Sequence, residues 1–163
     1  MLAQAKTKYG EAAVAITRVF AAPRALVWQA WTDPKMLAQW FGPRGFTASV
    51  PQLDVRVGGA LRIIMHGSDG NDYPMKGVFT EVEPPERLVF SNIAIDNDGN
   101  HLLEGETVVT LSEHDGKTTL TMKSHAVGLV RLLVHSLLQN VVWKNCKRNP
   151  LQVPTEGVRL KNV

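Results

Sequence analysis

The stretch AAVAITRVFAAPRALVWQAWTDP, residues 12–34, decides how the fold begins. Residues 12–20 are rich in β-branched and aromatic side chains, which predicts a strand. Pro23 fits the first turn of a helix, because its fixed φ is already helical and its missing N–H is not needed there. Apolar residues then recur four positions apart, which predicts a helix with one apolar side; the pairs are Leu26 with Ala30 and Val27 with Trp31.

A second short helix is predicted directly after the first. The Asp33-Pro34 step ends the first helix, and Asp33 can cap a helix that runs from Lys35 to Phe41. The Gly-Pro-Arg-Gly run at 42–45 breaks this second helix. The chain therefore begins strand, helix, helix.

Residues 46–125 change to strands separated by turns. Asp-Gly steps at 69–70, 98–99 and 115–116 lie between apolar runs, and glycine accepts the positive φ that tight hairpins require. Successive hairpins predict an antiparallel meander of six strands: Phe46–Val57, Leu61–His66, Met75–Val82, Arg87–Ile95, Leu103–Leu111 and Lys117–His125.

The segment 126–147 contains no proline and carries apolar residues along one broad helical face, which predicts a long amphipathic helix. The fold class is therefore α+β, in the order β-α-α-β₆-α. A curved sheet of seven antiparallel strands wraps around the long C-terminal helix, and we expect a cavity between them. We divide the chain into an N-terminal extension (1–11), one domain (12–148) and an atypical basic tail (149–163).

Composition and charge exclude several classes of protein. No stretch of the 163 residues approaches the ~20 apolar residues of a membrane span, and no secretory signal is visible, so we expect a cytoplasmic protein without a membrane partner. The lone Cys146 cannot form an internal disulfide. Residues 144–163 hold five basic residues and one acidic residue, which leaves thirteen basic against fourteen acidic residues elsewhere. The body of the domain is thus near neutral, and nucleic-acid binding is not expected.

Several sequence blocks resemble a known family. Over residues 14–125 the chain is similar to bacterial proteins related to the activator of heat-shock-protein-90 ATPase, within the START-like, birch-pollen-allergen-like (SRPBCC) superfamily. The resemblance is carried by ITRVFAAPRALVWQAWTDP (16–34), LAQWFGP (37–43), Gly58-Gly59, GVFTEV (77–82) and ERLVF (86–90). It implies a helix-grip fold around a hydrophobic cavity. Members of the superfamily have mixed roles: binding of lipid or polyketide-like ligands, occasional enzymatic activity, and chaperone interaction in the eukaryotic namesake.

The C-terminal end departs from this resemblance. Family members usually carry a Gly-Trp step near the middle of the last helix, whereas Val142-Trp143-Lys144 keeps only the tryptophan. Asn149-Pro150 also interrupts the helix where it should continue. A diverged end and an altered reading frame both account for these differences.

Large apolar side chains on the strands and the short helix are the candidate ligand site. Aromatic and methionine side chains that border a cavity suit an apolar ligand, while the alternative interpretation is ordinary core. We assign Trp28 and Trp31 to packing between helix and sheet. The candidates for lining the cavity are Trp40, Phe41, Leu61, Ile63, Met65, Met75, Phe79, Leu88, Phe90, Leu133 and Leu137.

Motifs for metal binding and catalysis are weak. The five histidines do not show the spacing of metal ligands. The Asp96–Asn100 run begins like a calcium loop, but its glycine is the fourth residue instead of the sixth, and the twelfth residue is Thr107 instead of glutamate. This pattern indicates a hairpin turn. The acids Glu81, Glu83, Glu104 and Glu106 alternate along strands, which favours an exposed sheet face over an acid–base pair in a cavity. We expect no catalytic residues, no metal and no cofactor.

These observations predict a protein that binds a small hydrophobic molecule between the sheet and the long helix. Two alternatives stay open. One is a protein-interaction module, either linked to a chaperone or forming a homodimer. The other is a cavity enzyme of the cyclase, dehydratase or hydrolase type.

Overall fold

The computed structural model describes residues 10–42, 45–96, 98–128 and 158–159. Two short helices follow the first strand: β1 (Gly10–Phe20), α1 (Arg24–Thr32) and α2 (Pro34–Trp40). Six strands come next: β2 (Thr47–Leu53), β3 (Ala60–His66), β4 (Asp72–Glu83), β5 (Arg87–Ile95), β6 (His101–His114) and β7 (Lys117–Gly128). A two-residue strand, β8 (Val158–Arg159), completes the order.

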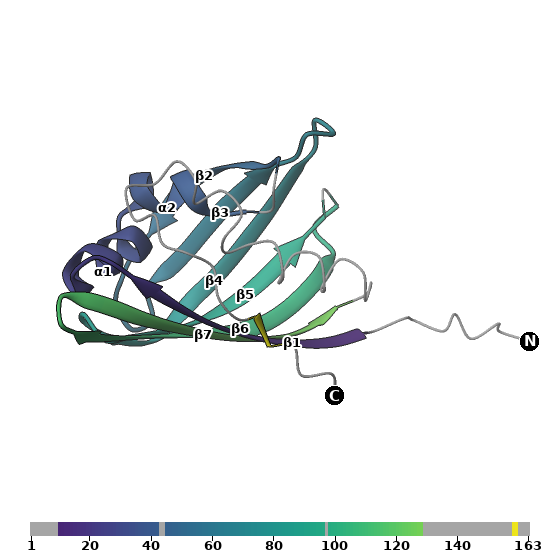
Figure 1. Cartoon of the computed structure of the whole chain (residues 1–163). Coiled ribbons are helices and arrows are strands. Elements are labelled where there is room, and N and C mark those ends of the chain that lie inside the picture. The colour runs from purple at the N-terminus through teal and green to yellow at the C-terminus, as the bar shows by residue number, and fades with distance from the viewer. Residues whose placement is uncertain (1–9, 43–44, 97, 129–157, 160–163) are drawn as a thin grey trace, which may run out of the picture.

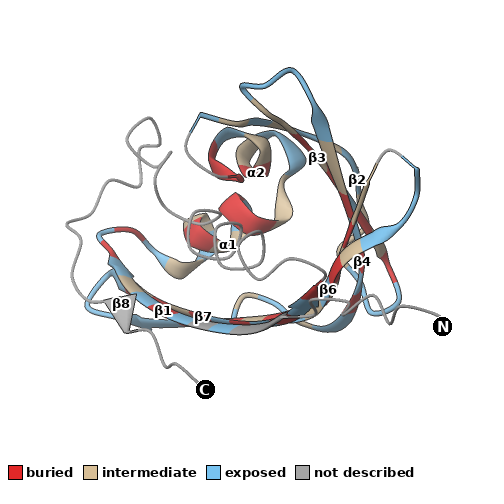
Figure 2. Cartoon of the chain, turned by 90° about the vertical axis from the view of Figure 1, so that its right-hand side faces the viewer, coloured by how far each residue is buried: buried red, intermediate tan, exposed pale blue. Residues whose placement is uncertain are grey.

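The strands form one antiparallel sheet in the order β2-β3-β4-β5-β6-β7-β1-β8. The sheet curls, and α1 and α2 lie inside its concave side (Figures 1 and 2). This arrangement confirms the predicted α+β class and the curved antiparallel sheet of seven main strands. The predicted C-terminal helix lies outside the described residues from position 129 onward.

Asp33 separates the two helices, as its position in the sequence predicts. Its backbone N–H donates to the carbonyl oxygen of Gln29 at the end of α1 (2.8 Å), while its Oδ1 accepts from the N–H groups of Lys35 and Met36 (both 2.9 Å). Pro34 occupies the start of α2, where no N–H is needed. Pro23 is the N-cap of α1 with φ −65°, so it stands one position before the predicted first turn.

One predicted boundary at the C-terminal end is wrong. β7 continues through Gly128, so Ala126 and Val127 belong to a strand and not to the start of a helix. Their pairing with both β6 and β1 explains the difference, because a central strand gains ladder hydrogen bonds on both sides. The tail also contains an unpredicted strand, since Val158 and Arg159 pair with Ile16 and Ala15 of β1.

The core lies between the concave face of the sheet and the two helices (Figure 2). Alternate residues of each strand point into it, as in the pairs Ile63 and Met65 of β3 or Leu120 and Met122 of β7. The indole rings of Trp31 and Trp40 meet edge to face with centroids 4.7 Å apart, and Nε1 of Trp40 donates to the carbonyl oxygen of Ala30 (2.9 Å). These contacts fix α2 against α1.

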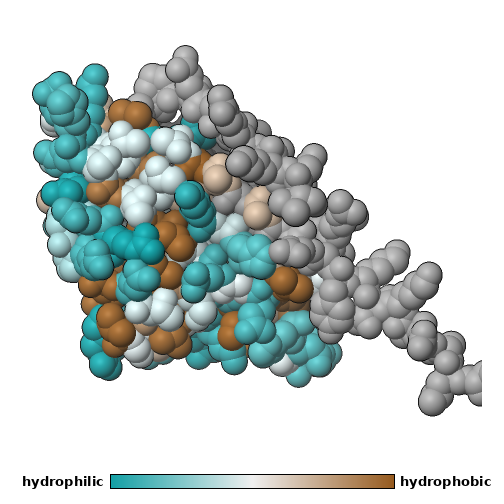
Figure 3. All heavy atoms as spheres, turned by 90° about the horizontal axis from the view of Figure 1, so that it is seen from below, coloured by the Kyte–Doolittle hydropathy of each residue, from teal (hydrophilic) through white to brown (hydrophobic). Residues whose placement is uncertain are grey.

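The convex face of the sheet is mixed in character. Seen from below, hydrophilic and neutral residues are interspersed with hydrophobic ones (Figure 3). Large hydrophobic residues exposed in the described part of the chain include Val19, Val57, Val78 and Val127. Within that part, no helix combines the length and the apolar character needed to cross a membrane.

Candidate functional site

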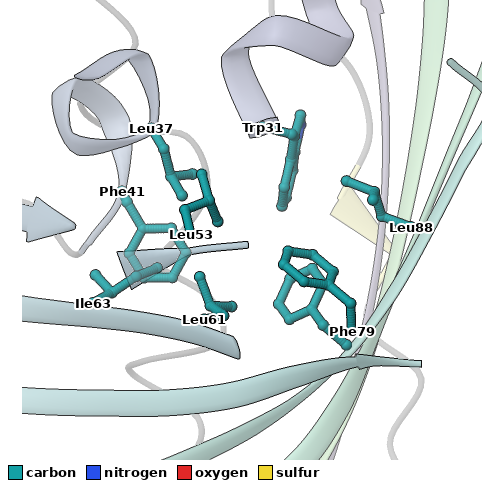
Figure 4. A pocket seen from close by; sticks show the side chains of 9 residues that line it. Trp31, Leu37, Phe41, Leu53, Leu61, Ile63, Phe79 and Leu88 are labelled. Atoms are coloured by element: carbon teal, nitrogen blue, oxygen red, sulfur yellow. The ribbon is translucent and has the colours of Figure 1, made fainter. Parts of the chain in front are cut away.

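An apolar pocket lies where the two helices meet the β2–β5 half of the sheet (Figure 4). The helical side contributes Trp31, Leu37 and Phe41, and the strands contribute Leu53, Leu61, Ile63, Phe79, Leu88 and Phe90. The space left between these side chains has a volume of about 10 Å³, roughly the room for one water molecule. The lining side chains therefore fill most of the pocket in this structure.

Phe79 is held in the pocket by its own backbone. The pairing of β4 with β5 shifts register between Phe79 and Glu81, which marks a bulge that re-aims the strand. The Gly58-Gly59 loop pairs with the same residue: the N–H of Gly58 donates to the carbonyl oxygen of Phe79 (2.8 Å), and the N–H of Phe79 donates to that of Gly59 (3.0 Å). A Cβ on Gly59 would collide with the carbonyl oxygen of Asp54, so this tight loop requires glycine.

The aromatic rings of the pocket contact one another across elements. The rings of Phe79 and Phe90 meet edge to face with centroids 5.7 Å apart, and the ring centroids of Trp31 and Phe90 are 6.4 Å apart. None of the nine lining side chains is ionisable. The described wall of the pocket therefore presents only apolar surface.

The ionisable groups with clearly shifted pKa values lie on exposed parts of the molecule. Arg87 Nε donates to Glu81 Oε2 (2.6 Å), which lowers the pKa of Glu81. The Tyr73 hydroxyl donates to Asp69 Oδ2 (2.6 Å) and, with the N–H of Asn71, lowers the pKa of Asp69 to about 2. Glu81, Glu83, Glu104 and Glu106 are all exposed, as the interpretation of an outer sheet face predicts.

The Asp96–Asn100 run forms a turn between β5 and β6. Asp96 Oδ1 accepts from the N–H groups of Asp98 (2.9 Å) and Asn100 (2.8 Å), so this carboxylate satisfies the backbone of the turn. In the described ranges, no three His, Cys, Asp or Glu side chains are grouped so that they could hold a metal ion.

Ser49, His66 and Asp72 form a hydrogen-bonded row on the outer face of β2–β4. His66 Nδ1 lies 2.6 Å from Asp72 Oδ1, and His66 Nε2 lies 3.0 Å from Ser49 Oγ. With the proton on Nδ1, the imidazole donates to Asp72 and accepts from Ser49, which is the order of a hydrolytic triad. Sequence analysis missed this row because strand pairing, not sequence spacing, brings it together: His66 lies opposite both Thr47 and Asp72.

Three buried polar side chains form a second row, which we call the polar ladder: Asn92, Thr107 and Ser124. They lie on the concave face of β5, β6 and β7, in line with the buried neighbours Phe90, Val109 and Met122. Asn92 Nδ2 donates to Thr107 Oγ1 (2.7 Å), which lies 2.9 Å from Ser124 Oγ. The sequence carries a signal for the ladder, because each polar residue interrupts an otherwise apolar alternation.

The sequence model of the family described as Activator of Hsp90 ATPase homolog 1-like protein matches residues 21–138. The chain belongs to this family. No curated protein sequence matches the chain.

Solved structures support membership of the Hsp90-activator-like family. Protein Ms6760 from Mycobacterium smegmatis is 35% identical, with 69% of this chain and 71% of that chain covered and a TM-score of 0.61. Protein CV1439 from Chromobacterium violaceum is 26% identical, with 78% of this chain and 90% of that chain covered and a TM-score of 0.69. The AHSA1 protein from Silicibacter pomeroyi is 27% identical, with 69% and 78% covered and a TM-score of 0.60.

In this member of the Hsp90-activator-like family, the predicted cavity residues fall into three groups. Phe41, Leu61, Ile63, Phe79, Leu88 and Phe90 line the pocket. Trp40, Met65 and Met75 are buried in the same core without lining it. Leu133 and Leu137 lie outside the described residues.

Three lining residues were missed by sequence analysis. Trp31 was assigned to helix–sheet packing, and it does pack there while also forming a wall of the pocket. Leu37 belongs to the short helix α2, whose apolar side turns toward the same space. Leu53 was obscured because β2 shifts register between Ser49 and Gln52, which breaks the simple alternation of the strand.

Proposed function

We propose that the protein binds a small apolar molecule in the pocket between α1, α2 and strands β2–β5. The observation that carries the proposal is the convergence of nine apolar side chains, four of them aromatic, with no ionisable group among them. Ligand sites are typically concave and mainly apolar, with polar groups few in number.

The pocket must open to admit a ligand. Its free volume of about 10 Å³ is far below the roughly 300 Å³ of a typical small-molecule site. The two short helices form one wall, and Trp31 and Trp40 join them to each other, so we expect this layer to move as a unit away from the strands. Burial of ~200 Å² of apolar ligand surface supplies about 5 kcal/mol, from which the cost of opening and of association is subtracted.

A titration with the fluorescent apolar probe N-phenyl-1-naphthylamine tests the proposal. Leu53 is half-buried at the edge of the pocket, so Leu53→Glu places a charge at the pocket without disrupting the centre of the core. We expect this variant to bind the probe at least tenfold more weakly than the wild type. The control is Gln52→Glu, which adds the same charge at an exposed neighbouring position. Absence of saturable binding by the folded wild type, or equal loss in both variants, contradicts the proposal.

The row of Ser49, His66 and Asp72 favours a second candidate function, hydrolysis of activated esters. Ser49 Oγ would attack the ester carbonyl carbon while its proton passes to His66 Nε2. The bond between the carbonyl carbon and the alcohol oxygen then breaks, and the alcohol leaves with the proton from His66. Water finally hydrolyses the acyl-serine and regenerates Ser49. Ser49 is exposed, and the side chains of His66 and Asp72 are 40% and 59% exposed. General-base catalysis contributes roughly 10²–10⁴-fold, and we expect an acceleration at the low end of this range because water reaches all three groups.

Reaction with p-nitrophenyl acetate tests this second function. Mass spectrometry should locate an acetyl group on Ser49 of the wild type and not on Ser49 of His66→Gln. Ser112→Ala, an exposed serine of β6, is the control and should leave the reaction unchanged. Equal rates of p-nitrophenyl acetate hydrolysis by Ser49→Ala and Ser112→Ala would contradict this function and mean that the row is only a hydrogen-bond network on the surface.

A further inference from the structure

The polar ladder costs the fold free energy that an apolar row would not. Asn92, Thr107 and Ser124 have relative exposures of 7%, 6% and 4%, so all three are more than nine-tenths buried. Their neighbours along the concave face are apolar, among them Phe90, Val109 and Met122. Polar groups in such a position are tolerated when their hydrogen bonds are satisfied, and each one left open is a site for a ligand or a water.

The hydrogen bonds of the ladder leave one acceptor and one donor without a partner in the ladder. Thr107 Oγ1 accepts from Asn92 and shares a proton with Ser124, so the middle member is satisfied on both sides. Asn92 Oδ1, an acceptor, has no hydrogen-bond partner among the described residues. Either Thr107 or Ser124 donates the hydrogen bond that joins their hydroxyl groups. The hydroxyl that accepts this bond keeps its own proton, which it can donate to a further acceptor. The ladder thus offers both an acceptor and a donor.

The ladder adjoins the apolar pocket through Phe90. Phe90 lines the pocket, and Thr107 is its cross-strand partner in the pairing of β5 with β6. Asn92 follows two positions along β5 on the same face, about 7 Å further at the usual rise of a strand. To reach the ladder, a molecule that fills the pocket would have to extend past Phe90.

We propose that the polar ladder binds a neutral hydroxyl or carbonyl group of the molecule whose apolar body occupies the pocket. This inference rests on the proposed function and adds to it the chemical class of the ligand: a hydrophobic molecule with one uncharged polar group. None of the twelve side chains of the pocket and the ladder is charged, so a carboxylate or an ammonium group would lose its hydration without gaining a counter-ion.

One cation on the concave face needs separate treatment. Arg18 lies between Ile16 and Phe20, which are buried on the same face of β1. It pairs with Leu120, whereas Ser124 lies four residues further along β7, about 13 Å away at the usual rise of a strand. Arg18 is thus out of hydrogen-bond reach of the ladder. A preference for anionic ligands would assign head-group recognition to Arg18 and overturn our proposal.

Three ligands with the same aromatic body test the inference: naphthalene, 2-naphthol and 2-naphthoate. Each is titrated against the protein loaded with N-phenyl-1-naphthylamine. For the wild type we expect 2-naphthol to bind about fivefold tighter than naphthalene, the gain from one or two modest hydrogen bonds, and 2-naphthoate to bind weakest. In an entirely apolar site the order of the first two is reversed, because the hydroxyl then loses its hydration without return.

The variants Thr107→Val and Asn92→Leu remove ladder groups with little change in volume. Both should lower the affinity for 2-naphthol until it binds no tighter than naphthalene, while the affinity for naphthalene stays within twofold and reports that the pocket is intact. Thr119→Val is the matched control, because Thr119 is a half-buried threonine on the outer face of β7. It should keep the fivefold preference.

The possible results separate the two levels of the argument. If naphthalene binds and the preference for 2-naphthol is absent, or survives in both ladder variants, the ladder is structural and the inference fails while the proposed function stands. If neither naphthalene nor the probe binds, the proposed function fails and the inference with it.

Discussion

Replacing Phe79 by alanine is the sharpest test of the pocket. Phe79 is 2% exposed, lines the pocket and meets Phe90 edge to face at 5.7 Å. Truncation of a buried phenylalanine costs 3–5 kcal/mol, because the transfer free energy and the contacts around the new cavity are both lost. We expect Phe79→Ala to lower the free energy of unfolding by ~4 kcal/mol, and the melting temperature by about 8–16 °C for a domain of this size.

Urea denaturation followed by tryptophan fluorescence measures this loss. The control is Val78→Ala, the neighbouring residue of β4, which is 43% exposed and should cost less than about 1 kcal/mol. The larger cavity in Phe79→Ala should also bind benzene, which at ten times its dissociation constant restores about 1.4 kcal/mol. A loss below ~1.5 kcal/mol, or no recovery with benzene in a folded variant, would refute the description of an apolar pocket filled by its own side chains.

Three further predictions concern the elements that frame the pocket and its surroundings. Asp33→Ala removes the cap of α2 and should cost ~1 kcal/mol in urea denaturation, whereas Asp33→Asn should cost much less. The carboxyl of Asp69 has a lowered pKa, so it stabilises the fold fully above its pKa in the unfolded chain, about 3.9, and this stabilisation is lost as the pH falls through its folded pKa of about 2. Carbon NMR of the Asp69 carboxyl should show a titration midpoint at this lower value, and Tyr73→Phe should move the midpoint upward. Gly59→Ala should destabilise the protein because its Cβ collides with the carbonyl oxygen of Asp54, and a melting temperature equal to that of the wild type would mean that the loop relaxes freely.

Local sequence signals predicted most of the fold. The Asp33-Pro34 step placed both helices, and the Asp-Gly steps placed the hairpins, because these residues act through their own backbone and side-chain geometry. Gly70, Gly99 and Gly116 all have the positive φ that such turns need. The end of β7 was harder to predict, since the pairing of Ala126 and Val127 with distant strands outweighs their local helical pattern.

The candidate site could be predicted only in part. Phe79 and Phe90 stand out as large apolar residues in strands, so the sequence points to them directly. Leu53 depends on a register shift in β2, and the rows containing His66 and Thr107 depend on which strands become neighbours. These features arise from long-range pairing, which one-dimensional patterns do not encode.

The pairing of β1 with β7 has a consequence for how the chain is made. The two strands pair from Gly10–Gly128 to Phe20–Thr118. β1, the first strand in the sequence, therefore cannot pair until β7 has been synthesised. Bringing together segments about 100 residues apart costs ~4 kcal/mol of loop-closure entropy. At 5–20 residues per second, a ribosome needs about 5–20 seconds to deliver β7 after β1. During that interval the hairpins of β2–β6 can form in sequence, while β1 has neither of its strand neighbours, β7 and β8.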